Sequence, residues 1–217
     1  ARGQGEALSI VNMVNKMKSD YSIDNSKVFV TGLSAGGYMT AVMMATYPDV
    51  FSGGAVMAGG PYKCATSMTA AFSCMSPGTD KSPTEWKTLA KQGYSSYNGT
   101  YPTLMVFHGS TDSTVKELNM TELMDQWTAM HDIDQTPDKT ETIAGHEVKS
   151  YQNASGKTLV KTYRIVGMGH AITVNPGTGE GQGGATGGYS VNKGLHSSYH
   201  AADFWGLNNK DQEPPVV

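Results

Sequence analysis

The sequence predicts an α/β fold with a mainly parallel sheet that helices cover on both faces. Its candidate strands are short, continuous apolar runs such as "TLMVFHG" at residues 103–109, the pattern of a strand buried on both faces. Segments with apolar residues at helical spacing separate these runs, which favours strand–helix–strand units. With 217 residues, the chain is long enough for one domain with a substantial core.

Helix and strand signals alternate along the chain. Apolar spacing predicts a helix over residues 6–19, and a β-branched run predicts a strand over residues 27–31. Further helices are predicted over residues 37–47, 84–93, 117–130 and 197–205, and further strands over residues 54–57, 103–109, 148–152 and 158–165. The last two strands read as a hairpin around "NASG". The glycine-rich stretch at residues 177–188 predicts a mobile loop.

Composition excludes some classes of partner. The net charge is −3 and no block of Lys or Arg occurs, so no nucleic-acid partner and no anionic membrane partner is expected. No apolar run approaches the ~20 residues that a membrane-spanning helix needs. The first residues, "ARGQGEALSI", lack the apolar core of a signal peptide.

A serine lies on a tight corner between a predicted strand and a predicted helix. Residues 32–36, "GLSAG", match the G-x-S-x-G pattern at the position where a nucleophile elbow belongs. We expect Gly32 and Gly36 to remove Cβ atoms that would clash in this turn. Ser34 is the candidate nucleophile, and the backbone N–H of Ala35 is the candidate oxyanion-hole donor. The alternative is a Gly/Ser turn in a ligand-binding protein without turnover.

A serine nucleophile needs an acid and a base, which α/β-hydrolases carry in the chain order Ser, Asp or Glu, His. Asp112 follows the predicted strand 103–109 in "HGSTDSTV", and His170 follows the strand 158–165 in "VGMGHAI". Only these two, with Ser34, satisfy both the chain order and the placement after strands. Taken alone, Asp112 could equally be an ordinary turn or capping residue. His108 either lines the site or is structural.

The remaining histidines give no metal site. His131 ends a predicted helix and His146 lies in a polar turn. His196 and His200 have the i, i+4 spacing of metal ligands, but no third ligand accompanies them. A solvated helix face is the favoured interpretation. No metal and no organic cofactor is expected.

The two cysteines, Cys64 and Cys74, are ten residues apart. This spacing suits neither a zinc knuckle nor a thioredoxin-like pair. A local disulfide in an oxidising compartment is favoured, and two buried reduced thiols are the alternative.

Several motifs together resemble the polyhydroxybutyrate-depolymerase-like esterases of the α/β-hydrolase superfamily, whose relatives include feruloyl and acetylxylan esterases. They are "RGQGEALSI", "VFVTGLSAGGYMTAVMMATYPDVFSGGAVMAGGPYKCA", "FHGSTDSTV", "QWTAMH", "GMGHAI" and "DFWGL". The resemblance implies a nucleophile at Ser34, an acid at Asp112 and a base at His170. It also implies a disulfide between Cys64 and Cys74.

The resemblance departs at the N-terminus. Family members carry roughly a hundred residues before the nucleophile, whereas Ser34 is preceded by 33 residues here. The run "KVFV" is apolar throughout, as in a central strand, and a bare apolar edge invites a partner strand. We therefore expect residues 1–207 to be an α/β-hydrolase catalytic domain whose N-terminal strands are missing from this chain. A second chain or an N-terminal fragment would complete the sheet. Residues 208–217 are a predicted polar, proline-containing tail or linker start.

The resemblance implies a secreted serine carboxylic-ester hydrolase that acts on polyesters of the polyhydroxyalkanoate type. One alternative is a feruloyl or acetylxylan esterase acting on plant polysaccharide. An alternative from another class is a truncated hydrolase fold that binds a ligand or a partner chain without catalysis.

Overall fold

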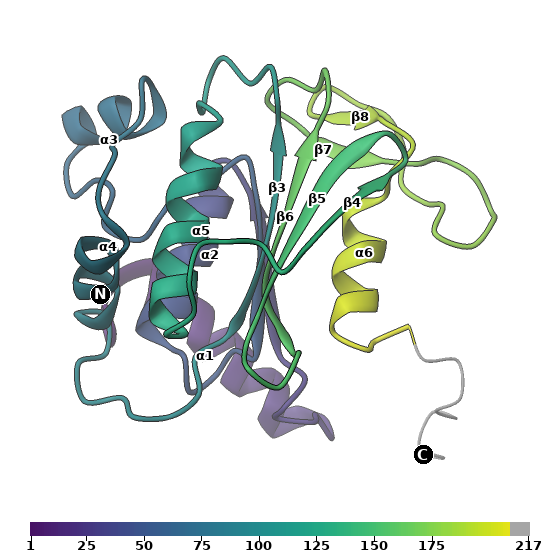
Figure 1. Cartoon of the computed structure of the whole chain (residues 1–217). Coiled ribbons are helices and arrows are strands. Elements are labelled where there is room, and N and C mark those ends of the chain that lie inside the picture. The colour runs from purple at the N-terminus through teal and green to yellow at the C-terminus, as the bar shows by residue number, and fades with distance from the viewer. Residues whose placement is uncertain (209–217) are drawn as a thin grey trace.

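The centre of the molecule is a six-stranded sheet with the strand order β1-β2-β3-β6-β5-β4 (Figure 1). A computed structural model describes residues 1–208. Strands β1, β2, β3 and β6 are parallel, and β5 and β4 extend the sheet in antiparallel fashion. The six strands are β1 (Phe29–Leu33), β2 (Gly53–Met57), β3 (Thr103–Gly109), β4 (Lys139–Ile143), β5 (His146–Gln152) and β6 (Thr158–Ile165). The predicted mainly parallel sheet is confirmed.

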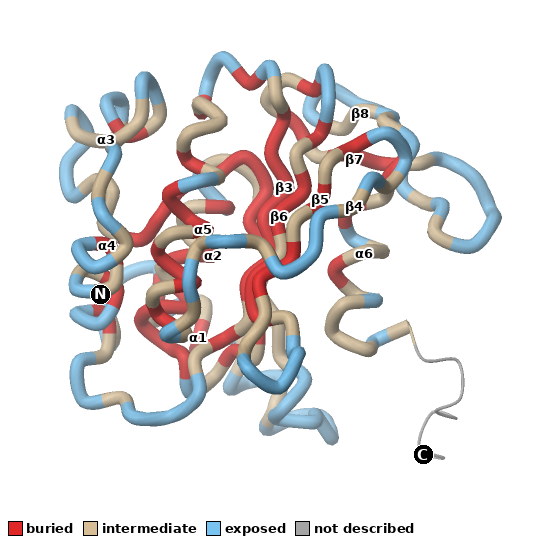
Figure 2. Tube along the Cα trace, in the orientation of Figure 1, coloured by how far each residue is buried: buried red, intermediate tan, exposed pale blue. Residues whose placement is uncertain are grey.

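Helices cover both faces of this sheet. Apolar residues of α2 and α5 pack on one face, α4 packs against α5, and α6 packs on the other face (Figure 1). Helix α1 packs against α2. The helices are α1 (Gly5–Asp20), α2 (Ala35–Thr46), α3 (Met68–Met75), α4 (Pro83–Lys91), α5 (Leu118–Met130) and α6 (Ser197–Phe204). Buried residues are concentrated in the sheet and in the helix faces turned toward it (Figure 2).

Every predicted helix and strand is present, with ends that shift by a few residues, but four elements are missing from the prediction. They are α3, β4, and the parallel pair β7 (Ile172–Val174) and β8 (Ser190–Asn192). Strand β4 reads "KTETI" and is mostly polar because it lies at the sheet edge. Strands β7 and β8 have three residues each, too few for a periodic pattern. Of the predicted tail at residues 208–217, all but the first residue lies outside the described residues.

Strand β1 pairs with β2 alone within residues 1–208. Its apolar composition follows from cover on both faces. Val30 packs with residues of α1 and α2. On the other face, the ring of Phe29 stacks on Trp205 with centroids 4.3 Å apart and planes 10° apart.

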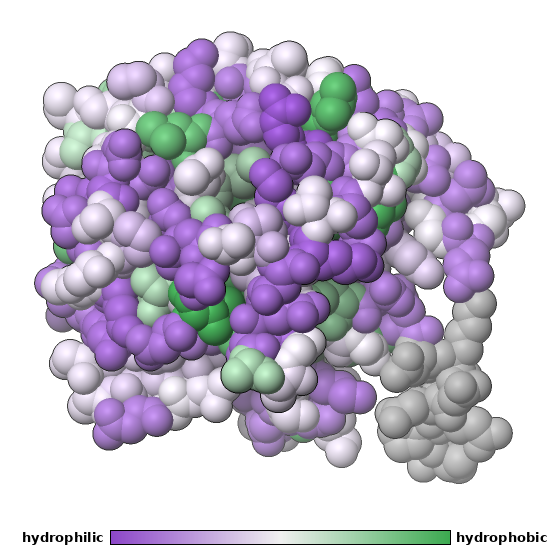
Figure 3. All heavy atoms as spheres, in the orientation of Figure 1, coloured by the Kyte–Doolittle hydropathy of each residue, from purple (hydrophilic) through white to green (hydrophobic). Residues whose placement is uncertain are grey.

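The surface is mixed in polarity. Hydrophilic residues predominate on the face shown in Figure 3, and hydrophobic residues form small separate patches there. Within residues 1–208, no helix has both the length and the apolar character needed to cross a bilayer.

Candidate active site

Ser34 lies on the corner between β1 and α2. Its backbone has φ 57° and ψ −119°, a conformation that costs a non-glycine residue on the order of 1–3 kcal/mol. Two backbone hydrogen bonds hold the corner: the Ser34 N–H donates to the Met57 carbonyl at 2.9 Å, and the Tyr38 N–H donates to the Ser34 carbonyl at 3.0 Å. The turn therefore raises the serine hydroxyl above the carboxyl end of the sheet.

The glycines around this corner have different roles. A Cβ on Gly32 would lie 2.3 Å from the carbonyl carbon of Gly36, so no larger residue fits there. We predicted that a Cβ would clash at Gly36 as well, and this prediction is wrong. A Cβ on Gly36 would meet nothing within 4 Å because the position faces open space. The close contact falls one residue later instead. A Cβ on Gly37 would lie 3.0 Å from the Met57 carbonyl oxygen, where α2 crosses β2.

The structure brings Ser34, His170 and Asp112 together. The Nε2 atom of His170 lies 2.8 Å from Ser34 Oγ, and its Nδ1 atom lies 2.8 Å from Asp112 Oδ2. A carboxylate only accepts hydrogen bonds, so Nδ1 carries the hydrogen and Nε2 accepts from the serine hydroxyl. The Asp112 side chain is fully buried and the His170 side chain is 13% exposed. Because β1, β3 and β6 are parallel, the loops that follow them meet at one edge of the sheet.

The two oxygens of Asp112 have separate partners. Oδ2 accepts from His170, whereas Oδ1 accepts from the backbone N–H groups of Thr114 and Val115, both at 2.9 Å. These hydrogen bonds offset the burial of a carboxylate, which is costly without partners. We call residues 110–117 the acid loop.

The loop that carries His170 is fastened to the acid loop. The Thr111 N–H and hydroxyl donate to the Met168 carbonyl at 3.0 and 2.9 Å. The Gly167 N–H donates to Ser110 Oγ at 2.9 Å. A Cβ on Gly109 would lie 2.2 Å from the Met168 carbonyl oxygen, so glycine permits this close approach.

The other histidines lie outside this hydrogen-bonded chain. His131 donates through Nε2 to the Pro102 carbonyl at 3.0 Å, and His146 donates to the Lys193 carbonyl at 2.8 Å. Burial lowers the pKa of His131 to about 4. His108 does not line the site but is wholly buried near the acid loop.

His196 and His200 lie at the start of α6 and within it. The His200 ring packs at 5.6 Å from the ring of Tyr163, between α6 and the sheet. The sequence predicted a solvated helix face here, but the face of α6 that carries His200 packs toward the sheet. In the described part of the chain, no group of three His, Cys, Asp or Glu residues is placed to hold a metal ion.

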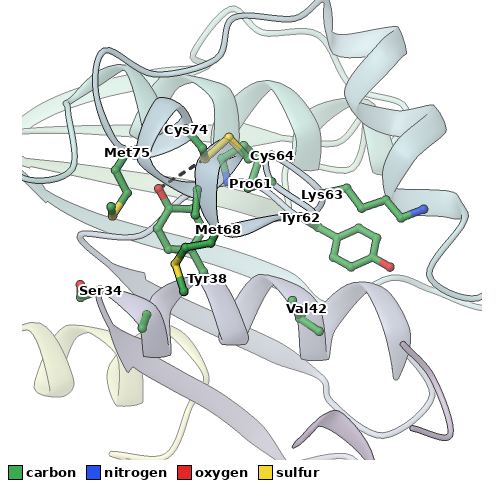
Figure 4. Close-up of a pocket in the computed structure, with 13 residues that line it drawn as sticks. Ser34, Tyr38, Val42, Pro61, Tyr62, Lys63, Cys64, Met68, Cys74 and Met75 are labelled. Carbon is green, nitrogen blue, oxygen red and sulfur yellow. Dashed lines mark hydrogen bonds between the residues drawn. A yellow bond between two sulfur atoms is a disulfide. The ribbon is translucent and has the colours of Figure 1, made fainter. Parts of the chain in front are cut away.

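A cavity of about 400 Å³ lies beside Ser34. Its far wall is α3 with the disulfide between Cys64 and Cys74. Figure 4 shows Tyr38, Met68 and Met75 pointing into the space between Ser34 and this disulfide. The lining is largely apolar and includes Tyr38, Val42, Pro61, Met68, Ala71 and Met75. We call this cavity the methionine pocket.

Asn119 fastens the wall of the methionine pocket, a role that sequence reasoning missed. It is 1% exposed, its Oδ1 accepts from the Tyr38 hydroxyl at 3.2 Å, and its Nδ2 donates to the Cys74 carbonyl at 2.9 Å. Burial, with the nearby charge of Asp112, raises the pKa of Tyr38, so its hydroxyl keeps the hydrogen that it donates. The sequence offered one signal: the cysteines indicate that the segment after β2 is tied back on itself.

A mainly parallel sheet with a serine on a strand–turn–helix corner, and with His and Asp after later strands, defines an α/β-hydrolase. Residues 1–164 match the family described as the prolyl oligopeptidase family, and the chain belongs to that family.

Individual relatives confirm the predicted resemblance to polyhydroxybutyrate-depolymerase-like esterases. The chain is 56% identical to poly(3-hydroxyalkanoate) depolymerase C of Paucimonas lemoignei over 206 residues, which cover 95% of this chain and 50% of the relative. It is 34% identical to feruloyl esterase B of Talaromyces stipitatus over 177 residues, 78% of this chain and 49% of the relative. The chain thus spans about half the length of these relatives.

A solved structure has the same fold. The acetyl xylan esterase from Aspergillus awamori aligns with a TM-score of 0.71 and 34% identity, covering 76% of this chain and 62% of that one.

Proposed function

We propose that the protein is a serine carboxylic-ester hydrolase that acts through Ser34, His170 and Asp112. The observation that carries the proposal is the hydrogen-bonded chain from Ser34 Oγ through His170 to Asp112, with both links at 2.8 Å. In an α/β-hydrolase fold this arrangement supplies a nucleophile, a base and an acid.

The reaction has two steps. Ser34 Oγ attacks the ester carbonyl while His170 Nε2 takes its proton, and Asp112 stabilises the imidazolium that forms. His170 then gives this proton to the leaving alcohol, which leaves an acyl group on Ser34. In the second step His170 takes a proton from water, the hydroxide displaces the acyl group as a carboxylic acid, and Ser34 recovers its proton. The Ala35 N–H, at the positive end of α2, stabilises the oxyanion in both steps.

The proposed substrate is a polyester of the polyhydroxyalkanoate type. Identity of 56% to a poly(3-hydroxyalkanoate) depolymerase supports this class. The apolar lining of the methionine pocket also supports it, because hydroxyalkanoate units carry short apolar side chains. Feruloyl and acetyl esters of plant polysaccharide are the second candidate, supported by relatives with 34% identity.

We also propose two features of the setting in which the enzyme works. The disulfide between Cys64 and Cys74 supports secretion into an oxidising compartment. The outer edge of β1, unpaired within residues 1–208, supports the predicted pairing with a strand of a second chain or an N-terminal fragment.

The first test is hydrolysis of p-nitrophenyl butyrate by this chain and by Ser34→Ala. We expect turnover by the wild-type chain and its loss in the variant. Release of 3-hydroxybutyrate from polyester films, compared with release of ferulate and of acetate from xylan, then separates the two substrate classes. No turnover by a folded wild-type sample would overturn the proposal that these residues suffice, and would favour the non-catalytic alternative.

A further inference from the structure

His108 is a buried histidine beside the triad that the proposed reaction does not use. It lies near the end of β3 and is wholly buried. Its Nε2 atom is 2.8 Å from the Val115 carbonyl oxygen and 3.8 Å from Asp112 Oδ2. The first distance is a hydrogen bond and the second is too long for one. A carbonyl only accepts, so Nε2 carries the hydrogen and donates to Val115.

The other ring nitrogen of His108 is Nδ1. Among the residues that the structure describes, no donor reaches Nδ1, although the atom is buried. A buried polar atom without a partner costs about 1–3 kcal/mol. An apolar ring of similar size would avoid this cost, but it would leave the Val115 carbonyl without the donor that His108 supplies. The bond from Nε2 to Val115 remains as the reason for a histidine at this position.

That bond fixes the residue that orients Asp112. Val115 is held on both sides: its carbonyl accepts from His108 at 2.8 Å, and its N–H donates to Asp112 Oδ1 at 2.9 Å. Thr114 donates to the same oxygen at 2.9 Å. With Oδ1 occupied by these two N–H groups, Oδ2 is the oxygen that faces His170.

We propose that His108 is a positioning residue of the triad: by holding the Val115 carbonyl, it keeps the acid loop in the conformation that directs Asp112 Oδ2 at His170. This inference rests on the proposed function. His108 does not form an ion pair with Asp112 in place of His170. The titratable groups near its ring are Asp112, Glu117 and His170. Burial lowers the pKa of His108 and outweighs the opposing effect of the two carboxylates, so the ring stays neutral.

Three substitutions separate the hydrogen bond from the packing. In His108→Gln the side-chain amide reaches as far as Nε2 and can donate to the Val115 carbonyl. In His108→Asn the amide is one methylene shorter and falls short of it, and in His108→Phe the ring remains without a donor. We expect His108→Phe and His108→Asn to lower kcat for p-nitrophenyl butyrate by about 10- to 100-fold, the size of effect that a small misplacement of a catalytic group produces. KM stays near the wild-type value, and His108→Gln recovers most of the activity.

A double-mutant cycle with Asp112 distinguishes positioning from general destabilisation. In the Asp112→Ala background the acid loop has no carboxylate to orient, so His108→Phe should change kcat little further. A full additional loss in that background would overturn the proposal. Thermal melts of each variant identify any that fail to fold.

A spectroscopic measurement tests the inference without turnover. The Nδ1 proton of His170, hydrogen-bonded to Asp112, gives a downfield proton resonance. We expect this resonance in the wild-type chain and in His108→Gln, and its loss from folded His108→Phe. Its persistence in His108→Phe would overturn the positioning role. If the wild-type chain shows the resonance but hydrolyses no ester, the proposed function fails while the positioning of Asp112 is still measured.

Discussion

At Ser34 the backbone adopts a conformation that glycine reaches more readily than any other residue. The φ of 57° and ψ of −119° are maintained by the Met57 carbonyl on one side and by the first turn of α2 on the other. This conformation exposes the hydroxyl to His170 at 2.8 Å. The position therefore combines a local cost in stability with the geometry that the proposed reaction needs.

Comparison of Ser34→Gly with Ser34→Ala measures this cost. Both variants lose the hydroxyl and its hydrogen bond to His170, but only glycine relieves the backbone strain. After allowance for the greater freedom of glycine in the unfolded chain, we expect Ser34→Gly to have a free energy of unfolding about 1 kcal/mol higher than Ser34→Ala. Denaturant unfolding of the two proteins measures the difference. Equal stabilities would limit the strain at this corner to the ~0.5–1 kcal/mol that glycine loses through its greater freedom in the unfolded chain.

Chain order and strand ends were sufficient to predict that Ser34, Asp112 and His170 lie together, because parallel strands present their following loops at one edge of the sheet. The sequence did not separate Gly32, which contacts the start of α2, from Gly36, which faces open space. This difference depends on the direction of one Cα–Cβ bond, which the G-x-S-x-G pattern does not encode.

Helix α3 is the element that gives the methionine pocket its outer wall. It is joined to the rest of the chain by the disulfide between Cys64 and Cys74 and by the hydrogen bond from Asn119 to the Cys74 carbonyl. The disulfide closes a loop with a sequence separation of 10, for which the chain-entropy relation gives about 3 kcal/mol. The wall is thus fixed by a covalent tie and a buried amide.

Replacement of both cysteines by serine should loosen this wall without moving Ser34, His170 or Asp112. We expect the free energy of unfolding to fall by about 2–3 kcal/mol. KM for p-nitrophenyl butyrate should rise more than KM for p-nitrophenyl acetate, because the longer acyl chain reaches farther into the pocket. Steady-state kinetics on both esters and denaturant unfolding provide the measurements. An equal rise for both esters would show that the wall does not contact the acyl chain.

Elements with long, one-sided patterns were predictable, and those defined by tertiary contacts were not. Strands β3 and β6 and helix α5 follow directly from their apolar patterns. Helix α3 has one buried residue, Cys74, so its position depends on the disulfide rather than on an apolar face. The methionine pocket combines residues from α2, α3 and the segment between β2 and α3, and no local pattern links them.

Across the whole molecule, two ionisable groups near the C-terminal half of α5 respond to pH in opposite directions. Burial lowers the pKa of His131 from 6.5 to about 4. Burial, with the charges of Glu122 and Asp80, raises the pKa of Asp125 from 3.8 to about 6. Between pH 4 and 6 the unfolded chain binds a proton at His131 that the folded chain does not, and the folded chain binds one at Asp125 that the unfolded chain does not. The two contributions to the pH dependence of stability therefore largely cancel.

Removal of either group should reveal the contribution of the other to the pH dependence of stability. In His131→Gln, whose amide can still donate to the Pro102 carbonyl, the effect of Asp125 remains alone, and stability should fall as pH rises from 4 to 6. In Asp125→Asn the effect of His131 remains, and stability should fall as pH decreases from 6.5 to 4. The slope of each variant should differ from the wild-type slope by at most about 1.4 kcal/mol per pH unit. The difference should fall below this limit because both side chains are partly exposed. Denaturant unfolding of the three proteins at intervals of pH measures the slopes. If the slopes of both variants differ from the wild-type slope in the same direction, the opposing contributions assigned to His131 and Asp125 are wrong, because every other group contributes equally to all three proteins.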